Sequence, residues 1–569
     1  MFLSLRDSVF SPFPLVSSPR FRYVQQCSTH TFDKILLKTR EDMFLQMRAD
    51  FKKQIDSFPD GFGPSFSIQF DPWTSTAGDP YLGISVSYLD EKFNLQRACL
   101  AVKEFRGQHT GQTIAGAITS VTDDFFPGLS PSQVFVAATS DSASNCISAA
   151  QHLCVPHHPC DAHRLNTAVR WGMGTTGTTG VDAPSCLNEP GRVLNTRVCA
   201  FVAHFTRSPL RGEKFRQIQE QYAEEASILE ASAPDLRHVR HCITRWNADV
   251  AMMKRVCELR VPQELYFHEH DIDNPVRLEY WEYQSCGHLC GVFSDAMQVC
   301  TSLQGGEGSS VSAAYSMFLD LQYSAKRNNI WVIDMHNGGP KEISRLDLDD
   351  RVAARAQDVF AKKLSKITDL AKATHVKKMC IILDLEVWMD LRDRDNTFDG
   401  ESLLRTEYER HRALVPSGSA PAPSPTEPST AIPDSQSDEG PDCIPLFLER
   451  NNRRSSLPSM QRRVRARPTP SPDDEVTRYM MFPHRQEGET VYDFWRTNAA
   501  NFPVLAMMAR KYLAIESTSC EVERVFSKGG CMIQKLRSCM LPWKVEAMMF
   551  VSTNKERHPL VKNFRAAMT

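Results

Sequence analysis

Three acidic residues stand where carboxylate chemistry is possible, although they are far apart in the sequence. Asp71 ends a segment with the composition of a β-strand, Asp141 ends another, and Glu523 lies in a helical segment near the C-terminus. Carboxylate oxygens are the hard ligands that Mg²⁺ requires, and two such ions about 3.5–4 Å apart can activate a hydroxyl and stabilise a leaving oxygen. A lone acid at a strand end or on a helix is more often a solvated charge. Further evidence is therefore needed before the three acids are assigned to one site.

Cysteine and histidine form two local groupings that could suggest zinc. These are Cys154-x2-His157 followed by Cys160-x2-His163, and Cys286-Gly-His288-Leu-Cys290. Zinc fingers separate their two ligand pairs by about a dozen residues or more, and neither grouping has that gap. The spacing argues against zinc. The 17 cysteines are otherwise scattered, which is typical of a reducing compartment.

A Pro/Ser-rich segment and a basic segment follow each other before the C-terminal block. Residues 415–441 have almost no bulky apolar side chains, so we expect disorder there. The basic segment carries Arg450, Arg453, Arg454, Arg462, Arg463, Arg465 and Arg467. Such a stretch can hold DNA phosphates, and a solvated tether without a partner explains it equally well.

Bulk properties exclude several classes of protein. A chain of 569 residues exceeds one compact core, so two or three domains are expected. The sequence is 41% hydrophobic and has no run of the roughly 20 apolar residues that a membrane helix needs. The net charge of −2 argues against a uniformly basic nucleic-acid binder, so any DNA contact must come from local patches.

The elements that would position the acids follow from residue patterns. Strands are predicted at 66–71, 81–89, 97–102 and 134–138, because these runs are rich in β-branched and aromatic residues. Helices are predicted at 109–126 and 142–152. This order predicts an α/β core with a mixed sheet. From about 190 to 410 the pattern becomes helical, with Trp246, Val250, Met253 and Cys257 at helical spacing, which predicts an all-helical insertion.

The C-terminal block is helical and dense in apolar residues. Phe502, Leu505, Met508, Ala509, Tyr512 and Leu513 form one face. Thr518-Ser-Cys-Glu521 matches a capping box, which predicts a helix starting near 519 and explains Glu521 structurally. Gly529-Gly530 is expected to end that helix, and Leu541-Pro542 to open the last one. Val545, Ala547, Met548, Met549, Phe550 and Val551 make the last helix apolar nearly all round, so it must be buried in a core or against another chain.

Six short blocks occur in one order along residues 66–558. They are Phe70-Asp71-Pro72-Trp73-Thr74-Ser75, His109-Thr110-Gly111, Ser140-Asp141-Ser142-Ala143-Ser144-Asn145, Cys160-Asp161-Ala162-His163-Arg164-Leu165-Asn166, Thr244-Arg245-Trp246-Asn247 and Val522-Glu523-Arg524-Val525-Phe526-Ser527. Together they resemble the hAT superfamily of DNA transposases. Two positions depart from its pattern, since Ser142 replaces an Asn and Val522 replaces a Ser.

The resemblance implies an α/β plus all-α fold, in which an RNase H-like mixed sheet is interrupted by a helical insertion. The implied domains are a partial N-terminal helical region (1–60), the first part of the core (61–168), the insertion (169–410), a linker (411–472) and a dimerisation region with the last catalytic helix (473–558). It also implies that Asp71, Asp141 and Glu523 form a set that binds Mg²⁺ or Mn²⁺. Cys160 and His163 would lie nearby, although a buried thiol and a helix-start histidine are at least as good a reading.

The resemblance further implies DNA and a second copy of the chain as partners, and the nucleus as the compartment. Trp246, beside Arg245, would stack an extruded base, although a core tryptophan is an equal alternative. Leu541, Val545, Met548, Met549 and Phe550 are expected to contribute to dimerisation. No membrane or small-molecule substrate is expected. No BED zinc-finger pattern precedes Asp71, and we expect the sequence to begin partway into a domain. The chain is therefore either an active transposase or an inactive, dimerising DNA-binding or interaction protein.

Overall fold

The computed structural model describes most of the chain as two compact units. The described residues are 29–75, 78–175, 187–228, 236–240, 248–270, 272–305, 310–336, 338–348, 351–394, 398–414, 474–483, 485, 488–532 and 541–557. The larger unit is Met1–Val415 with Pro483–Thr569, and the smaller is Pro416–Phe482, in which helix α18 (Glu475–Met480) is described. The predicted disordered and basic segments at 415–467 lie outside the described residues, as do Arg245 and Trp246.

A five-stranded mixed sheet forms the α/β part of the larger unit, in the order β3-β2-β1-β4-β5. Its strands are β1 (Phe66–Thr74), β2 (Pro80–Leu89), β3 (Leu95–Glu104), β4 (Phe135–Ser140) and β5 (His157–Pro159). The pairs β1–β2 and β2–β3 are antiparallel, whereas β1–β4 and β4–β5 are parallel. All four strands predicted from the sequence are present, and the mixed sheet is confirmed.

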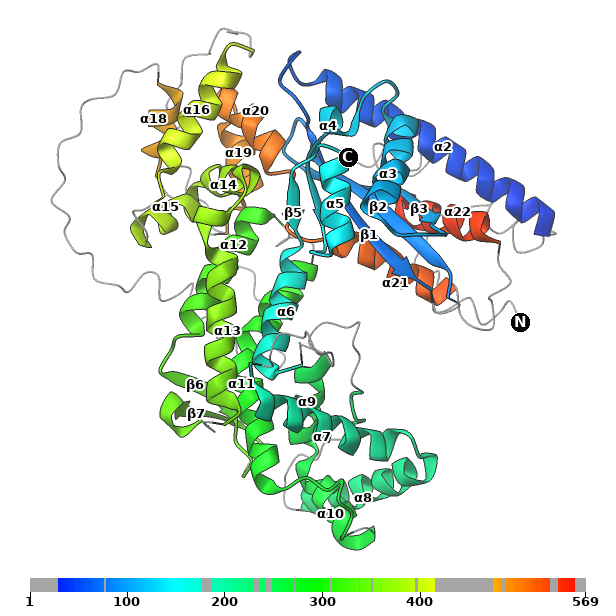
Figure 1. Cartoon of the computed structure of the whole chain (residues 1–569), viewed down its shortest axis with the longest axis vertical. Helices are drawn as coiled ribbons and strands as arrows, with labels where there is room; N and C mark the ends of the chain where they lie inside the picture. Colours follow the sequence, from blue (N-terminus) through cyan, green and yellow to red (C-terminus); the bar gives the residue numbers. More distant parts are fainter. Residues whose placement is uncertain are drawn as a thin grey trace, which may run out of the picture. The chain divides into compact units, whose positions relative to one another are not determined.

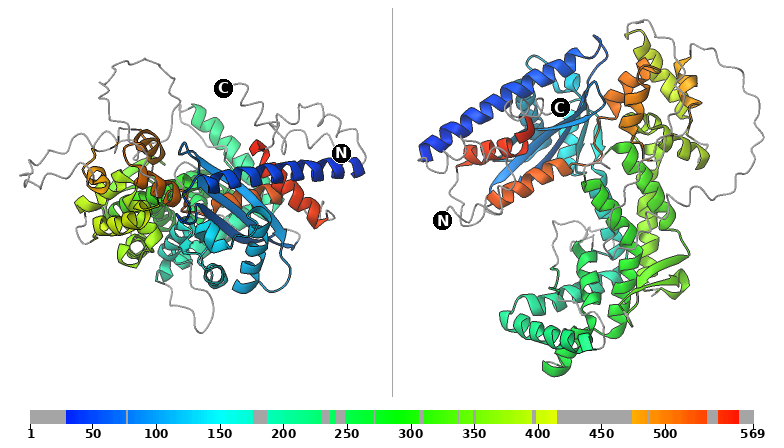
Figure 2. Two further views of the ribbon diagram at one scale, coloured as in Figure 1. Left: turned by 90° about the horizontal axis from the view of Figure 1, so that it is seen from above. Right: turned by 180° about the vertical axis from the view of Figure 1, so that it is seen from behind.

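Helices cover both faces of this sheet (Figures 1 and 2). Phe66, Ile68 and Phe70 of β1 share one apolar core with α2 (Thr29–Asp56), α3 (Gly111–Phe125) and α5 (Ser144–His152). The opposite face packs against α21 (Cys520–Met532) and α22 (Pro542–Thr553). Because side chains alternate along a strand, the intervening residues of β1, which include Asp71, face α21. The short helix α4 (Pro131–Val134) leads into β4.

The chain leaves the sheet after β5 through α6 (Asp161–Met173), which packs against α11 and α13 (Figure 1). The helices that follow are α7 (Glu189–Thr206), α8 (Pro209–Ile228), α9 (Ala248–Glu258), α10 (Arg260–His270), α11 (Tyr280–Gln304), α12 (Val311–Ser324) and α13 (Ala353–Thr368). Val250, Met253 and Cys257 are buried on α9 at the predicted helical spacing. These helices share one apolar core.

The insertion is not all-helical as expected. Antiparallel strands β6 (Asn329–Ile333) and β7 (Pro340–Ser344) form a hairpin that packs on α11. A side chain at Gly291 of α11 would lie 2.3 Å from the carbonyl oxygen of Trp331, so this glycine permits the close approach of β6. The strands have only 5 residues each, which left too short a pattern for detection.

A second helical layer joins the end of the insertion to the C-terminal block. It contains α14 (His375–Ile382), α15 (Leu385–Arg394), α16 (Gly400–Arg412), α19 (Val491–Asn498) and α20 (Pro503–Tyr512). The predicted apolar face of α20 is confirmed, because Leu505, Met508 and Ala509 are fully buried. Short 3-10 turns occur at Arg345–Asp347, Leu370–Lys372 and Lys555–Arg557.

Helix α21 differs from expectation at both ends. It begins at Cys520, so Thr518 is too early to cap it, and Glu521 pairs with Arg524 instead of closing a capping box. It also continues through Gly529-Gly530 to Met532. A side chain at Gly529 would lie 2.5 Å from Cε of Met549 on α22. Gly529 is therefore a site of close helix packing, and this packing outweighs the weak helix propensity of glycine.

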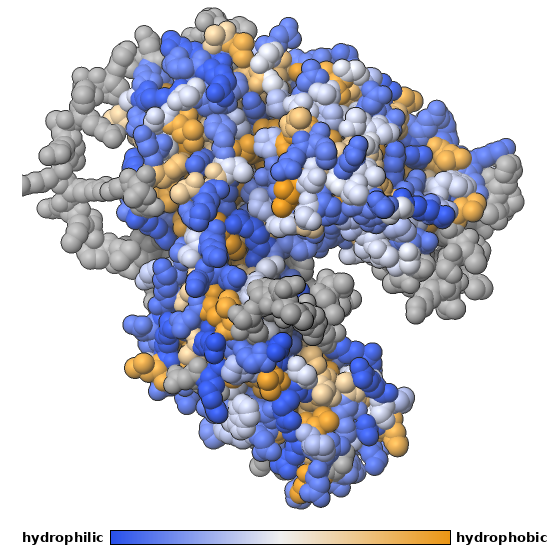
Figure 3. Space-filling view, in the orientation of Figure 1, coloured by the Kyte–Doolittle hydropathy of each residue, from blue (hydrophilic) through white to orange (hydrophobic). Residues whose placement is uncertain are grey.

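The surface gives no sign of a membrane segment. Apolar side chains are scattered among polar ones over the face drawn in Figure 3, which is ordinary for a protein surface. Among the described residues, no helix combines the length and the apolar character that a bilayer-spanning segment requires.

Candidate active site

Two of the predicted acids lie at matching positions on neighbouring strands. Strands β1 and β4 are parallel, and Gln69 pairs with Thr139. Asp71 lies two residues beyond Gln69, and Asp141 lies two residues beyond Thr139, directly after the last residue of β4. Since alternate residues share a face, both acids leave the same face at the same edge of the sheet.

The third acid is brought in by the packing of α21 on that face. Asp71 pairs across the sheet with Gly83 of β2. A side chain at Gly83 would lie 2.5 Å from Cγ1 of Val522, so α21 rests directly on the backbone of β2. Trp73 of β1 also stacks on Phe526 with ring centroids 5.1 Å apart. These contacts fix the position of α21, the helix that carries Glu523, on the sheet.

The charges of the three acids interact. Burial, together with the negative charges of Glu523 and Asp141, raises the pKa of Asp71 to about 8, although His163 acts to lower it. Burial also raises the pKa of Glu523, again opposed by His163. Nδ1 of His163 lies 4.0 Å from Oε1 of Glu523. The ionised forms of Asp71 and Glu523 are therefore disfavoured, and a cation bound beside them would stabilise those forms.

The donor set suits a hard divalent ion, although it is not arranged around one point. Oε1 of Glu523 is buried and accepts no hydrogen bond from a described residue, which leaves it available as a ligand. Oδ1 of Asp141 accepts the backbone N–H of Ala143 at 3.1 Å. Within the described ranges, no three His, Cys, Asp or Glu side chains already surround a single metal position. A bound ion would require the carboxylates to rearrange around it.

Cys160 and His163 take different roles at the start of α6. The backbone N–H of Cys160 donates to the carbonyl oxygen of Ser140 at 2.7 Å, and its Sγ accepts the N–H of Ser519 at 3.4 Å. Burial raises the pKa of this thiol to about 12, so it stays protonated. Cys160 therefore ties β4 to the segment before α21, while His163 reaches the acids from the first turn of α6.

A buried segment before α21 was not foreseen from the sequence. Thr139 donates its hydroxyl to the carbonyl oxygen of Glu516 at 2.8 Å, and Arg97 of β3 forms an ion pair with the Glu516 carboxylate. Burial raises the pKa of Glu516, opposed by Arg97. Arg97 and Glu516 are 419 positions apart in the sequence, so no local spacing could have indicated their pairing.

Helix α22 is largely enclosed by its own chain. Val545, Met549 and Phe550 are at most 3% exposed, and the helix packs against β3, α2 and α21. This differs from the exposed apolar surface expected for self-association, because these three side chains already fill the core. Of the five residues expected in the dimer contact, Met548 is half-buried and Leu541 is 60% exposed.

The C-terminal block is similar to a region of known proteins. Residues 475–554 match the model of the hAT family C-terminal dimerisation region. Two maize proteins, a putative AC transposase and a putative AC9 transposase, are each 20% identical to this chain over 85% of its length. The chain is thus similar to hAT proteins at its C-terminal block, and more distantly over most of its length. This agrees with the resemblance carried by its motifs.

A further relative carries a different kind of name. The putative transcriptional regulator tpeD of Talaromyces stipitatus is 19% identical over 96% of the chain. The chain spans 60% of the length of that protein and 56% of each maize protein. The match to a dimerisation region supports self-association of this chain.

Proposed function

We propose that this chain is a hAT-type transposase, or descends from one, that cleaves and transfers DNA strands with Mg²⁺ or Mn²⁺. The observation that carries the proposal is the electrostatic coupling of Asp71, Asp141 and Glu523, which come from two strands and a distant helix. A mixed sheet that places two acids at matching positions on neighbouring strands, with a helix adding a third acid, supports an RNase H-like assignment. The maize relatives named as transposases point the same way.

In this proposal Asp71, Asp141 and Glu523 hold the metal. When bound, the ions supply a polarised nucleophile and stabilise the leaving oxygen. Asp71 is held within β1, Asp141 directly after β4, and Glu523 by the packing of α21 on Gly83. His163 places Nδ1 of its ring 4.0 Å from Oε1 of Glu523.

Strand cleavage tests the proposal. Purified full-length chain is incubated with Mg²⁺ or Mn²⁺ and DNA that carries the terminal repeats flanking its gene, and nicked product is measured. The Asp141→Asn variant should lose activity by at least about a thousandfold, which is the scale for removing one essential group. Asp124→Asn, an exposed acid on α3, is the matched control and should cut normally. Unchanged nicking by Asp141→Asn would refute the assignment.

The second candidate function is a non-catalytic protein that dimerises and binds DNA or another protein. It is favoured by the relative named as a putative transcriptional regulator, which matches over nearly the whole chain. The departure at Ser142, next to Asp141, also favours it. Sequence-specific DNA binding without nicking, equal in wild type and Asp141→Asn, would establish this alternative.

A further inference from the structure

Helices α6 and α13 lie side by side where the chain leaves the sheet (Figures 1 and 2). Helix α6 begins at the candidate active site, because His163 in its first turn approaches Glu523, and the two side chains are 32% and 33% exposed. His163, Thr167 and Trp171 are spaced by four residues and therefore share one face of α6. Thr167 is exposed on that face. The candidate active site thus opens onto this face of α6.

Helix α13 is strongly basic beside this face. It carries one acid, Asp358, and four basic residues, which are Arg355, Lys362, Lys363 and Lys366. Arg164 of α6 donates to the carbonyl oxygen of Lys366 at 3.4 Å. Nζ of Lys363 lies 3.8 Å from the ring centroid of Trp171 on α6. These two contacts place the lysines next to the exposed face of α6.

The three lysines of α13 form no ion pair with a carboxylate in the described part of the chain. Asp358, on the same helix, pairs with Arg345. Asp369, directly after the helix, pairs with Lys372 at 3.3 Å. Partial burial, together with the positive charges of the other two lysines, lowers the pKa of Lys363. Positive charges gathered at one place without local counter-charges favour an anionic partner.

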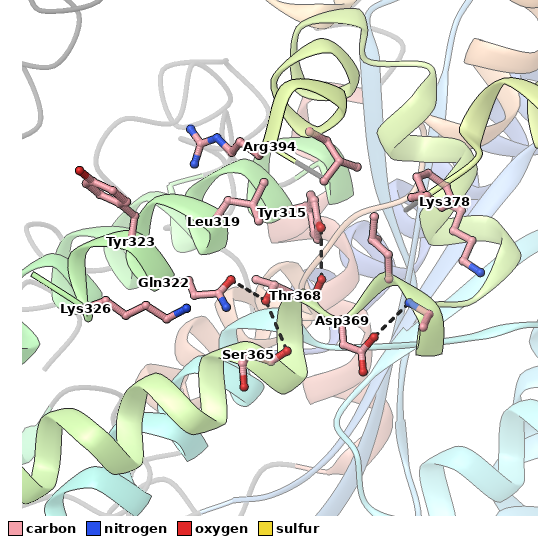
Figure 4. A pocket seen from close by; sticks show the side chains of 14 residues that line it. Tyr315, Leu319, Gln322, Tyr323, Lys326, Ser365, Thr368, Asp369, Lys378 and Arg394 are labelled. Atoms are coloured by element: carbon pink, nitrogen blue, oxygen red, sulfur yellow. Dashed lines mark hydrogen bonds between the residues drawn. The ribbon is translucent and has the colours of Figure 1, made fainter. Parts of the chain in front are cut away.

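A cavity of about 570 Å³ borders another side of α13 (Figure 4). Ser365 and Thr368 line it, and Thr368 donates its hydroxyl to Oε1 of Gln322 on α12 at 2.9 Å. Helix α12 therefore lies against that side of α13. Lys362 and Lys366 are exposed, and neither lines the cavity. The basic surface and the cavity are therefore distinct.

The chemistry of the basic surface fits the backbone of duplex DNA. Lysine ammonium groups bind phosphates as point charges and do not read the bases. Single strands are usually bound by stacking on aromatic rings, whereas the Trp171 ring is half-buried and already carries Lys363. Trp171 lies about 12 Å along α6 from His163, at 1.5 Å per residue. That distance corresponds to about three to four base pairs.

We propose that Lys362, Lys363 and Lys366 bind phosphates of duplex DNA next to the strand that is cut, so that the duplex leaves the candidate active site along α6 and α13. This inference rests on the proposed action on DNA, and it adds the surface along which the DNA lies. Because the whole chain has a net charge of −2, phosphate binding requires a local basic surface of this kind.

Binding of a fluorescein-labelled DNA duplex to the full-length chain, measured by anisotropy across a salt series, tests this proposal. The triple variant Lys362→Gln, Lys363→Gln and Lys366→Gln should reduce the slope of log K against log salt by up to about 2.7, since each duplex phosphate contact contributes about 0.9. The control variant changes to Gln three exposed lysines that each pair with a carboxylate, and its slope should equal that of the wild type. These control lysines are Lys38, Lys52 and Lys254.

A negative charge placed on α6 tests the path of the DNA independently. Thr167→Glu adds this charge on the face that His163 shares, and it should weaken duplex binding several-fold by repelling phosphates. Thr119→Glu, at an exposed position of α3 on the other face of the sheet, is the matched control and should bind as the wild type does. Equal binding by the two variants would overturn the path along α6.

The outcomes separate this surface from the proposed function. If the wild type binds duplex DNA and the triple variant keeps its slope, the surface proposal is overturned while action on DNA stands. If the wild type binds no DNA, both are overturned. If the slope changes as expected but the chain cuts no DNA, the surface stands and the non-catalytic candidate is favoured. Tighter binding of oligothymidylate or duplex RNA through the same lysines would identify a different partner and overturn the duplex DNA proposal.

Discussion

Gly83 of β2 lies directly beneath Val522 of α21, with too little space between them for a methyl group. Gly83→Ala should therefore push α21 from the sheet and destabilise the chain by about 1–3 kcal/mol, the scale for overpacking a core. Urea denaturation measures this. Gly116→Ala on α3 is the matched control, because nothing lies within 4 Å of its added carbon. That control should gain up to about 1 kcal/mol from helix propensity. Equal stability of the two variants would show that the Gly83 contact is unimportant.

Metal binding should be visible without catalysis. Millimolar Mg²⁺ or Mn²⁺ is expected to raise the melting temperature of the wild type by several degrees, because an ion bound only to the folded state stabilises it. Asp141→Asn should abolish this increase, and Asp124→Asn should retain it. If neither ion changes the melting temperature of the wild type, the non-catalytic alternative is favoured.

Glu407 of α16 predicts a loss of stability in acid. It accepts the hydroxyl of Tyr512 at 2.6 Å and lies 3.5 Å from Nε2 of His375. Although burial raises its pKa, these partners lower it from 4.5 to about 2. The folded state therefore binds this proton more weakly than the unfolded state. The stabilisation is complete above pH 4.5 and is lost as the pH falls toward 2.

Glu407→Gln should remove this contribution, on the order of 2 kcal/mol at neutral pH, and flatten the stability profile between those values. Glu401→Gln is the control, because that side chain is 42% exposed and pairs only locally with Arg405. Denaturant melts at a series of pH values give the profiles. Parallel profiles for wild type and Glu407→Gln would contradict the prediction.

Helix α22 gives a prediction on self-association. Met549 is fully buried, so Met549→Ala should cost about 2–5 kcal/mol through the cavity it creates. Leu541 and Trp543, at the start of the helix, are 60% and 37% exposed. Changing both to Glu should leave the fold intact and shift the chain from dimer to monomer in light scattering. A stable dimer in that double variant would place the interface elsewhere.

Local patterns predicted the sheet well, because strand alternation and strand ends can be identified from a few residues. Asp71 and Asp141 were found for that reason, and the family motif added Glu523. The cross-strand pairing of Asp71 with Gly83 was not predictable. Its importance depends on the packing of α21 on β2, which no local pattern shows. Arg97 and Glu516 were missed for the same reason, because each forms its ion pair with a residue more than four hundred positions away in the sequence.

One expectation failed where packing overrides local preference. Glycine favours helix termination, which predicts a helix end at Gly529-Gly530. The actual role of Gly529 is to admit Met549 of α22, which stabilises the continued helix. The apolar pattern of α22 predicts burial in a core or against another chain, and β3, α2 and α21 of the same chain pack against it. Periodicity indicates that such a face is buried, but it does not indicate which part of the structure covers it.

The order of the acids along the chain has a consequence for synthesis. More than three hundred residues separate Asp141 from Glu523. At about 5–20 residues per second, a ribosome needs roughly 20–80 s to travel between them. During that interval the nascent chain carries both aspartates but neither Glu523 nor the helices that cover that face of the sheet. An unfinished polypeptide, or one from a transcript broken anywhere in the insertion, therefore lacks a complete acidic set and exposes an uncovered sheet to chaperones.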